Sequence, residues 1–243
     1  MEYSNACRDA LISVIIPVYN EISTVDAMIG QVKRIHDEAE VVFVDGGSTD
    51  GTAERIKENG FRLVRSAKGR GRQLNEGARA AGGSILFFLH CDCEIPDDAL
   101  DQIREVMARG EYGCFGAKFP SRNFFMWTNR VISNRRAFRR GMPFGDQGVF
   151  MTRRLFDEMG GYKDIPLMED VDLSERMRSR GYMPLRTRSP LVVSIRRYGK
   201  GTIGILKTEY FMWNLRRMYR KGADPDQLNR IYGDVRQRSR NGK

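Results

Sequence analysis

Cysteines and long apolar runs are scarce in this sequence. Only four of its 243 residues are cysteines, at positions 7, 91, 93 and 114, which argues against a disulfide framework and predicts reduced thiols. No stretch approaches the ~18 apolar residues of a membrane span. Residues 1–11 carry charges and lack the apolar core and cleavage site of a signal peptide. We therefore expect a cytoplasmic protein.

Internal repeats and low-complexity linkers are also missing. The motif G-x-G-x-x-G does not occur, which excludes the dinucleotide fingerprint. The length, with 41% hydrophobic and 30% charged residues, suits one sizeable core, or a core with a small appendage.

The net charge of +10 is distributed unevenly along the chain. Residues 1–121 contain 14 Lys and Arg against 19 Asp and Glu, whereas residues 122–243 contain 27 against 12. A basic second half favours an anionic partner, which is a nucleic acid, a phospholipid surface or a phosphorylated substrate. Many of these basic side chains also serve only as solvated helix faces.

Short apolar runs alternate with helical patterns in the first half. The runs cover residues 11–20, 39–51, 61–66 and 84–90, and Leu74, Ala78 and Ala81 share one helix face between them. Continuous apolar strands separated by helices predict an α/β fold with a mostly parallel sheet, flanked by helices on both faces.

The second half has a looser pattern. It predicts strands over residues 113–119 and 147–152 and helices over residues 123–138 and 167–182. Two further helices are predicted over residues 202–221 and 224–240, with Asp224 as a cap and Pro225 in the first turn.

Polar residues follow three of the predicted strands. Ligands of parallel sheets bind outside the carboxyl ends of the strands, so we expect one binding site to contain Asn20 with Glu21, residues 45–50, and residues 90–94. Asp45 suits a ribose hydroxyl or a base edge. The alternative is that residues 46–51 form only a turn with a helix cap at Ser48 or Asp50.

The segment from His90 to Glu94 contains several metal-binding side-chain types. Zinc is not expected, because one C-x-C pair and one histidine do not supply a structural site. Asp92 and Glu94 suit Mg²⁺ or Mn²⁺, which take one or two carboxylates and leave other positions to phosphates and water. The alternative is an acidic loop before a helix that begins near Pro96.

Two other acidic pairs remain ambiguous by themselves. Glu169 and Asp170 open a predicted helix, where acidic residues complement the helix dipole without any function. Asp146 and Gln147 precede a strand. Basic and amide side chains at the start of the helix after the third strand suit an anion; these are Arg70, Arg72 and Asn75.

Taken together, these motifs resemble the family 2 glycosyltransferases. The matching segments follow the family's order from about residue 11 to residue 181: SVIIPVYNE (13–21), VVFVDGGSTDGT (41–52), GRGRQLNEGARAAGG (69–83), LFFLHCDCEIP (86–96), GDQGVF (145–150) and GGYKDIPLMEDVDLSERMRSRG (160–181). The segments RGRQLN, GDQ and IPLMED are similar to those of a bacterial subgroup named for arsenosugar biosynthesis. That label does not establish a substrate.

The resemblance implies a GT-A nucleotide-sugar fold and roles for individual residues. Asp45 would contact the nucleotide base, Asp92 would be the metal-binding member of a D-x-D-like element, and Asp170 would be the catalytic base beside Glu169. His90 stands where the family usually has an acidic residue, which weakens the expectation of metal dependence, although Glu94 offers compensation. The remaining expected donor contacts are Pro17, Tyr19, Glu21, Gly46, Arg72, His90, Asp146 and Gln147.

The implied reaction is an inverting transfer from a nucleoside-diphosphate sugar to an acceptor hydroxyl. Asp170 would take the hydroxyl proton, and Mg²⁺ or Mn²⁺ at Asp92 would stabilise the leaving diphosphate. Arg72, Arg196 and Arg197 are candidate diphosphate ligands. The acceptor is a small molecule or lipid-linked, and no nucleic-acid partner is expected.

The expected domain organisation is a transferase domain over residues 1–200 and a basic helical extension over residues 201–243. The nucleotide-binding half would cover about residues 11–110 and the acceptor half about residues 111–200. Basic and aromatic residues on helix 202–221 suit a phospholipid surface or a homodimer interface. We favour packing on the main domain, because apolar positions nearly encircle this helix.

Two rival functions follow from the same sequence. A nucleotidyltransferase that forms sugar nucleotides would need a basic glycine-rich loop after the first strand, and PVYNEIS does not provide one. A non-enzymatic nucleic-acid-binding protein would use the basic second half, and would have no need of Asp45, Asp92 and Asp170.

Overall fold

The computed structural model describes residues 10–198 and 201–241, so Cys7 lies outside the described residues. The first half alternates strands and helices as predicted: β1 (Ile12–Val18), α2 (Ile22–Lys33), β2 (Ala39–Asp45), α3 (Thr52–Glu58), β3 (Arg62–Arg65), α4 (Arg70–Ala80), β4 (Ile85–Phe88), β5 (Cys93–Glu94) and α5 (Ala99–Met107). The second half comprises β6 (Tyr112–Lys118), α6 (Phe124–Arg140), the short 3₁₀ helix η1 (Gly145–Gln147), β7 (Val149–Thr152), α7 (Arg153–Glu158), α8 (Glu169–Ser179), β8 (Leu185–Val193), α9 (Gly201–Arg220) and α10 (Pro225–Asn241).

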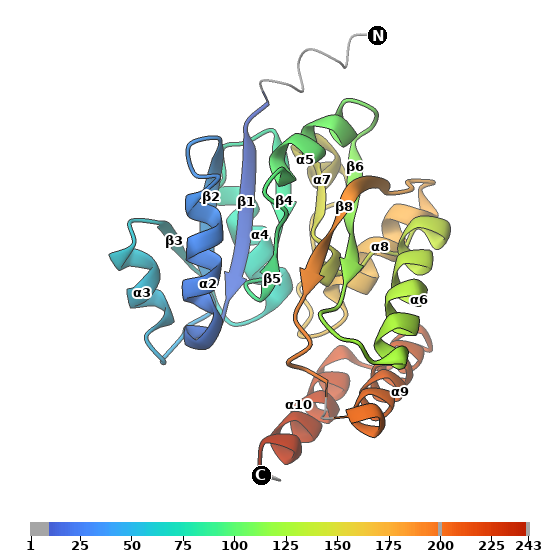
Figure 1. Cartoon of the computed structure of the whole chain (residues 1–243). Helices are drawn as coiled ribbons and strands as arrows, with labels where there is room; N and C mark the ends of the chain where they lie inside the picture. Colours follow the sequence, from blue (N-terminus) through green and yellow to red (C-terminus); the bar gives the residue numbers. More distant parts are fainter. Residues whose placement is uncertain (1–9, 199–200, 242–243) are drawn as a thin grey trace.

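The strands form one eight-stranded sheet in the order β3-β2-β1-β4-β7-β6-β8-β5. Strands β3, β2, β1 and β4 are parallel neighbours, and β6 is parallel to β8. The remaining pairs, of β4 with β7, β7 with β6 and β8 with β5, are antiparallel. Figure 1 shows the arrows of β1, β6 and β8 pointing to the edge of the sheet on which α9 and α10 lie.

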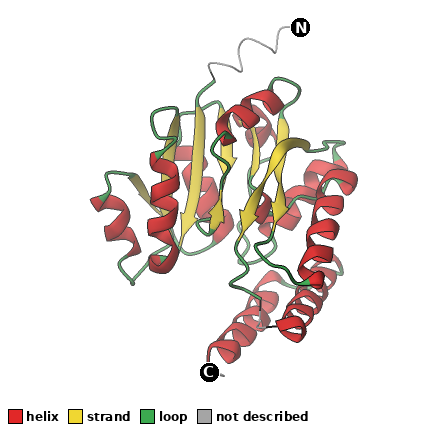
Figure 2. Ribbon diagram, viewed as in Figure 1, coloured by secondary structure: helices red, strands yellow, loops and turns green. Residues whose placement is uncertain are grey.

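Helices cover both faces of this sheet, which confirms the predicted α/β architecture (Figure 2). Alternate residues of β1 belong to opposite layers, because successive strand side chains point to opposite faces. Val14 and Ile16 pack with α2, α3 and α5, whereas Ile15 packs with α4 and, through the same cluster, with residues of α7 and α8. Both layers are fully buried at β1, so the apolar strand pattern follows from burial on two sides.

The C-terminal helices pack against the second half of the domain. Leu215 of α9 and Leu228 of α10 form a buried cluster with Phe144, Met168 and Val171, which surround η1 and the start of α8. Ile205 of α9 packs at the ends of β6 and β8 in another cluster. Asp224 accepts a hydrogen bond from the backbone N–H of Asp226 over 3.2 Å, as expected of a helix cap. The predicted packing of this extension on the domain is therefore present.

Several elements differ from the sequence prediction. Strand β8 was not predicted, because charged residues interrupt its apolar positions and Pro190 weakens a strand signal. Helix α7 was also missed. Helix α8 begins at Glu169 and not at residue 167, since Met168 has a left-handed backbone with φ of 74°. Helix α5 begins at Ala99, three residues after Pro96.

The three described cysteines are buried and unpaired: Cys91, Cys93 and Cys114. Burial, the largest cause, raises the pKa of Cys91 to about 12, so the thiol stays protonated at neutral pH. The predicted reduced state holds for these three residues. Among the helices of residues 10–198 and 201–241, none has the length and apolar character of a membrane span.

Candidate active site

The loops after β1 and β2 are hydrogen-bonded to each other at the carboxyl edge of the sheet. The backbone N–H of Asn20 donates to Ser48 Oγ, and Asn20 Oδ1 accepts from the backbone N–H of Thr49, each over 2.9 Å. Within the described chain, Asn20 (φ 54°) and Met168 are the only non-glycine residues with positive φ. Both flank predicted site residues, which agrees with the tendency of strained backbone to occur at functional sites.

Gln73 also links the ends of β1 and β2. It belongs to α4, which covers the face of the sheet opposite to α2 and α3. Its buried Nε2 donates to the carbonyls of Val18 and Val44, each over 2.8 Å. The N–H of Gly46 also donates to Val18 O, over 3.0 Å. A methyl group at Gly46 would lie 3.0 Å from Gln73 Cδ. A larger residue at position 46 would therefore have to displace the Gln73 amide.

Asp45 is fully buried at the last position of β2. Its Oδ2 accepts from Arg65 Nη1 over 2.8 Å, and its Oδ1 accepts from the backbone N–H of Ser48 over 3.0 Å. The carboxylate orientation is therefore fixed by partners on both oxygens. The N-cap of α3 is Gly51, with no side-chain cap, and not Ser48 or Asp50 as the alternative supposed; Asp50 Oδ1 accepts from the backbone N–H of Thr52 over 3.1 Å.

Arg196, which follows β8, joins Glu21 to Asp92. Its Nη2 lies 2.7 Å from Glu21 Oε1, and its Nε lies 2.9 Å from Asp92 Oδ2. A single guanidinium thus connects the loop after β1 with the loop after β4. Glu21 and Asp92, both predicted to bind the donor, are therefore paired with Arg196, which the sequence suggests as a diphosphate ligand.

His90 lies against Gly145, beside η1. A methyl group at Gly145 would be 2.7 Å from His90 Nε2 and 3.6 Å from Asp170 Oδ2, so Gly145 is in contact with both side chains. His90 Nε2 is buried, and it has no hydrogen-bond partner among the described residues. Burial, and next the positive charge of Arg70, lower the pKa of His90 to about 4. The imidazole is therefore neutral at neutral pH.

Asp146 pairs with Arg197, whose Nη2 lies 2.9 Å from Asp146 Oδ2. Burial opposes ionisation of Asp146, but Arg197 and then Arg136 keep the pKa of this carboxyl below its usual value. The second oxygen, Oδ1, is buried and has no partner in the described part of the chain. A buried unpaired carboxylate oxygen is costly, so it is a natural ligand position.

Gln147 is fully buried behind this group. Its Oε1 accepts from Arg136 Nη2 over 3.1 Å, and its Nε2 lies 3.4 Å from Asn134 Oδ1. Arg136 itself stacks on the ring of Phe144, with its guanidinium carbon 3.2 Å from the ring centre. Gln147 therefore orders the loop around η1 and makes no approach to the open edge.

Asp170 lies in the first turn of α8 and is fixed by two backbone donors. Its Oδ2 accepts from the N–H of Gly145 over 3.0 Å, and its Oδ1 accepts from the N–H of Val171 over 2.7 Å. The first of these bonds connects α8 to η1. The Asp170 carboxylate and the His90 ring therefore both lie against Gly145.

Glu169 is buried beside Asp170 and pairs with Arg70 at the start of α4. The distance from Arg70 Nη1 to Glu169 Oε1 is 3.2 Å. Burial, the largest cause, raises the pKa of Glu169 to about 7; Asp170 adds to this rise and Arg70 opposes it. A carboxyl with such a pKa exchanges protons near neutral pH.

Three further predicted residues lie around the edge. Arg72 donates through Nε and Nη2 to Asp164, with a shortest distance of 2.6 Å, so its guanidinium is already engaged. Tyr19 is exposed, and Lys68 Nζ lies 4.4 Å above its ring. Pro17 is half-buried within β1, opposite Val44 on β2.

The structure brings five of the predicted residues close together and leaves Asp45 apart from them. His90, Asp146 and Asp170 converge on Gly145, and Asp92 connects to Glu21 through Arg196. Asp45 lies at the same edge of the sheet, but β1 separates its strand from β4. Among the described residues, no hydrogen bond or ion pair joins Asp45 to this group.

A preformed metal cluster is not present in the described residues. No three His, Cys, Asp or Glu side chains come close enough there to hold an ion. His90 Nε2 and Asp146 Oδ1 have no partner among these residues, so a hard cation held here would take most of its ligands from a phosphate and water. The donor set does not resemble a four-ligand site.

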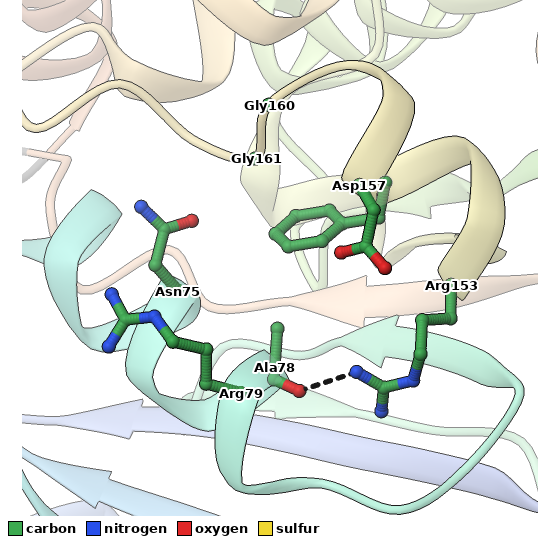
Figure 3. Close-up of a pocket in the computed structure, with 8 residues that line it drawn as sticks. Asn75, Ala78, Arg79, Arg153, Asp157, Gly160 and Gly161 are labelled. Atoms are coloured by element: carbon green, nitrogen blue, oxygen red, sulfur yellow. Dashed lines mark hydrogen bonds between the residues drawn. The ribbon is translucent and has the colours of Figure 1, made fainter.

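A separate cavity of about 280 Å³ lies between α4 and α7 (Figure 3). None of the predicted donor, metal or catalytic residues lines it. Asn75, suggested from sequence as an anion ligand, does line it, but its amide is bonded to the backbone of Tyr162 in both directions. Arg153, on the other side, donates to the carbonyl of Ala78. The lining residues are Asn75, Ala78, Arg79, Arg153, Phe156, Asp157, Gly160 and Gly161.

The sequence reasoning missed two residues that organise this site. Gln73 lies within a matching motif, but its only sequence signal is that it is a polar residue on the same helix as the buried Leu74 and Ala78. Gly145 was also unassigned. A glycine next to two acidic or amide residues gives no signal of a close contact, because its partner His90 is 55 residues away.

Comparison with known proteins identifies a family. The model of glycosyl transferase family 2 matches residues 13–161. The undecaprenyl-phosphate 4-deoxy-4-formamido-L-arabinose transferase of Aeromonas hydrophila is 26% identical over 167 residues, which are 61% of this chain and 51% of that protein. This chain therefore spans about half the length of that curated relative.

A second relative is matched over more of its length. The PGL/p-HBAD biosynthesis glycosyltransferase of Mycobacterium bovis is 27% identical over 212 residues, 82% of either chain. Among solved structures, glucosyl-3-phosphoglycerate synthase from Mycobacterium tuberculosis, in complex with Mn²⁺, UDP and phosphoglyceric acid, superposes with a TM-score of 0.63. It is 18% identical and covers 91% of this chain and 82% of its own, which shows a shared fold.

Proposed function

This chain belongs to glycosyl transferase family 2 and has the GT-A fold, and from this premise we propose that it catalyses an inverting transfer. The sugar moves from a nucleoside diphosphate to an acceptor hydroxyl, with Asp170 as the general base. The observation that carries the proposal is the position of the Asp170 carboxylate, fixed by the Gly145 N–H beside His90. The rival functions weighed from sequence are not proposed, because no feature of the site favours them.

The proton transfer assigned to Asp170 follows from its fixed geometry. As the acceptor oxygen forms its bond to the anomeric carbon, its proton passes to the Asp170 carboxylate, and the bond between that carbon and the diphosphate oxygen breaks on the opposite side. Such base assistance contributes about 10²- to 10⁴-fold. Glu169 is paired with Arg70 of α4, and this pair holds the first turn of α8 in position.

The nucleotide is assigned to the edge formed by β1 and β2. Asp45 contacts the base, and Pro17, Tyr19 and Gly46 border the same position. This assignment is supported by Gly46, which allows a close backbone approach; Asp45, whose oxygens are bonded to Arg65 and Ser48, would exchange one of these partners for the base.

The diphosphate is assigned to the basic side chains that follow β8. Arg196 and Arg197 lie next to Asp92 and Asp146, and guanidinium groups match phosphate oxygens in geometry. Arg72 is a further candidate, which donates through Nε and Nη2 to the single carboxylate of Asp164. A divalent ion, Mg²⁺ or Mn²⁺, would be held by Asp92, with His90 and Asp146 nearby, and would neutralise charge on the leaving diphosphate.

The domain division is proposed as expected from sequence. Residues 1–200 form the transferase domain, with halves that meet at about residue 110, and residues 201–243 form the basic extension. The packing of α9 on Phe144 and Met168 supports a contribution of the extension to the acceptor side. A lipid-linked acceptor is supported by the name of the Aeromonas relative, which specifies undecaprenyl phosphate. The arsenosugar subgroup stays a prediction.

A thermal-shift panel tests the proposal. The full chain is heated with nucleoside diphosphates and nucleotide sugars, with and without Mn²⁺ or Mg²⁺. We expect one class of donor to raise the melting temperature, and to do so more strongly with the metal. NMR then monitors the consumption of that donor and gives the anomeric configuration of the product. Indifference to every nucleotide, or a product with retained configuration, would contradict the proposal.

A further inference from the structure

Helices α6 and α9 carry most of the exposed large apolar side chains. Twelve such side chains are exposed among the described residues, and eight of them belong to these two helices: Phe124, Phe125, Trp127, Ile132, Ile203, Leu206, Tyr210 and Trp213. We use the term aromatic surface for six of these, which are Phe124 and Trp127 of α6 with Ile203, Leu206, Tyr210 and Trp213 of α9. Scattered apolar residues are normal on a protein surface, whereas a concentration on two adjacent helices is informative.

The two helices are joined at their N-terminal ends. Asn123 Nδ2 donates to Thr202 Oγ1 over 3.0 Å, and Asn129 Nδ2 donates to Glu209 Oε1 over 2.8 Å. Figure 1 shows the start of α6 beside α9, at the end of the molecule to which the strand arrows of β6 and β8 point. The exposed aromatic residues of both helices therefore lie at the same end of the molecule.

The α9 part of the aromatic surface is a continuous stripe. Its four apolar residues recur at intervals of three and four, which places them on one face of the helix. Tyr210 and Trp213 are 66% and 50% exposed, and their rings stack with centroids 6.2 Å apart. Ile205 and Leu215 pack on the domain from another face of the helix. The helix thus has an apolar face that the described domain leaves uncovered.

The α6 part resembles it in composition. Phe124 is 65% exposed and Trp127 is 56% exposed, and their rings stack with centroids 5.9 Å apart. Both lie in the first turn of the helix, beside the exposed Arg122 and Arg130.

Only basic charges accompany these residues at the surface. Residues 112–145 contain no Asp or Glu and seven Lys or Arg. On α9, Lys207 and Arg217 are exposed, and the Arg217 guanidinium lies 5.5 Å from the Trp213 ring centre. The single acidic residue of α9, Glu209, is half-buried and bonded to Asn129. The surface therefore combines aromatic rings with positive charge.

We propose that the aromatic surface docks the protein on the face of an anionic lipid bilayer. Aromatic and aliphatic side chains beside Lys and Arg match the boundary between acyl chains and anionic headgroups. A second copy of the chain fits less well, because a two-fold interface would place basic residues of both copies opposite each other. Single-stranded nucleic acid would use the rings but not the aliphatic Ile203 and Leu206.

Docking in this orientation brings the lipid surface toward the candidate active site. The same helix that exposes Tyr210 and Trp213 packs through Leu215 on Phe144 and Met168, next to Asp170. A lipid-borne hydroxyl or phosphate acceptor would then reach the site along α9. This last consequence rests on the proposed function, whereas the docking surface does not.

Tryptophan fluorescence provides a direct test, because both tryptophans of the chain belong to the aromatic surface. The full chain is titrated with vesicles of phosphatidylcholine, with and without phosphatidylglycerol, and bound protein is measured by flotation. We expect a blue shift and flotation with anionic vesicles, both weakened by salt. The variants Trp127→Phe and Trp213→Phe assign the shift to each helix, and both tryptophans are expected to contribute.

Matched variants separate the aromatic surface from general stickiness. Ile203→Ser with Tyr210→Ser keeps both tryptophans and should weaken vesicle binding about tenfold. Lys207→Glu with Arg217→Glu should weaken it by about fivefold per charge or more. The control, Leu11→Ser with Met183→Ser, removes two exposed apolar side chains elsewhere and should bind as the parent does. Melting curves establish that each variant is folded.

Three results would overturn the docking proposal. The first is equal binding of the parent and of the Ile203→Ser, Tyr210→Ser variant to anionic vesicles. The second is a dimer in lipid-free solution, seen by light scattering and dissociated by that same variant. The third is binding of a single-stranded oligonucleotide without binding to vesicles. None of these measurements depends on sugar transfer, so the docking proposal and the proposed function can fail separately.

Discussion

The Arg196 Nε lies 2.9 Å from Asp92 Oδ2. The residue that the sequence predicts as a metal ligand is therefore paired with a cation supplied by the segment after β8. Any divalent ion that binds Asp92 competes with this guanidinium, and binding is then coupled to a movement of Arg196 away from the carboxylate.

Replacing Arg196 should therefore strengthen metal binding in the absence of nucleotide. We expect Arg196→Ala to lower the Mn²⁺ dissociation constant about three- to tenfold, a modest effect because both side chains are partly exposed. Isothermal titration or the Mn²⁺ electron-spin signal measures it. Arg188→Ala removes the same charge from an arginine of β8 that is paired with Asp98 and Glu105, and it should have little effect. Unchanged affinity in Arg196→Ala would show that Asp92 does not bind the ion.

Substitution of the proposed base should separate catalysis from donor binding. Asp170→Asn keeps one oxygen for either the Gly145 or the Val171 N–H group, turns its NH2 group toward the other, and cannot take the proton of the acceptor hydroxyl. We expect kcat to fall by about 10²- to 10⁴-fold, while the donor-induced thermal shift stays close to that of the parent. Asp157→Asn, at an exposed position of α7, serves as the control. Parent-like turnover in Asp170→Asn would remove Asp170 from this role.

A methyl group at Gly145 should disturb the site through His90. The added Cβ would lie 2.7 Å from His90 Nε2, so either the imidazole or the η1 backbone must move. We expect Gly145→Ala to lose about 1–3 kcal/mol of unfolding free energy and most activity. Gly30→Ala, within α2, meets no atom within 4 Å and should gain about 0.5–1 kcal/mol. Urea denaturation compares the two; a neutral Gly145→Ala would refute the contact.

The protonation of His90 can be observed directly. The chain has two histidines, so His36→Gln assigns the His90 ring signal in a proton NMR titration of metal-free protein. We expect His90 to titrate near pH 4, well below the ordinary value of 6.5. Because the folded pKa is lowered, the contribution of His90 to stability is complete above about pH 6.5 and is lost as the pH falls toward 4. His90→Gln should flatten this part of the stability profile, and an ordinary His90 titration would contradict the burial.

Glu169 should act in the opposite direction. Its folded pKa is raised by burial to about 7, from an ordinary 4.5. The stability linked to Glu169 is therefore complete below about pH 4.5, and it is lost as the pH rises through 7. We expect Glu169→Gln to reduce the decline in unfolding free energy between pH 5 and pH 7. Denaturation at several pH values measures it, and an unchanged slope would mean that Arg70 keeps the carboxylate ionised.

The sequence by itself determined the layered α/β fold and the edge on which the site lies. The side chains of β1 are apolar on both faces of the sheet because both faces are covered. Polar residues begin only where the strand ends, at Asn20 and Glu21. These are local properties of a strand covered on two sides, and they can be read without coordinates. The start of α10 at Pro225 was accessible for the same reason, since a helix cap is encoded within four residues.

Only the tertiary structure decided how the site residues are partnered. The pairing of Asp92 with Arg196 joins residues 104 positions apart, and that of Arg70 with Glu169 joins residues 99 positions apart. Side-chain contacts of this kind depend on how separate elements dock, and no periodicity in the chain encodes them. Strand β8 belongs to the same class, because the parallel pairing of Leu191 with Ala117 in β6 stabilises a segment whose own sequence is a poor strand former.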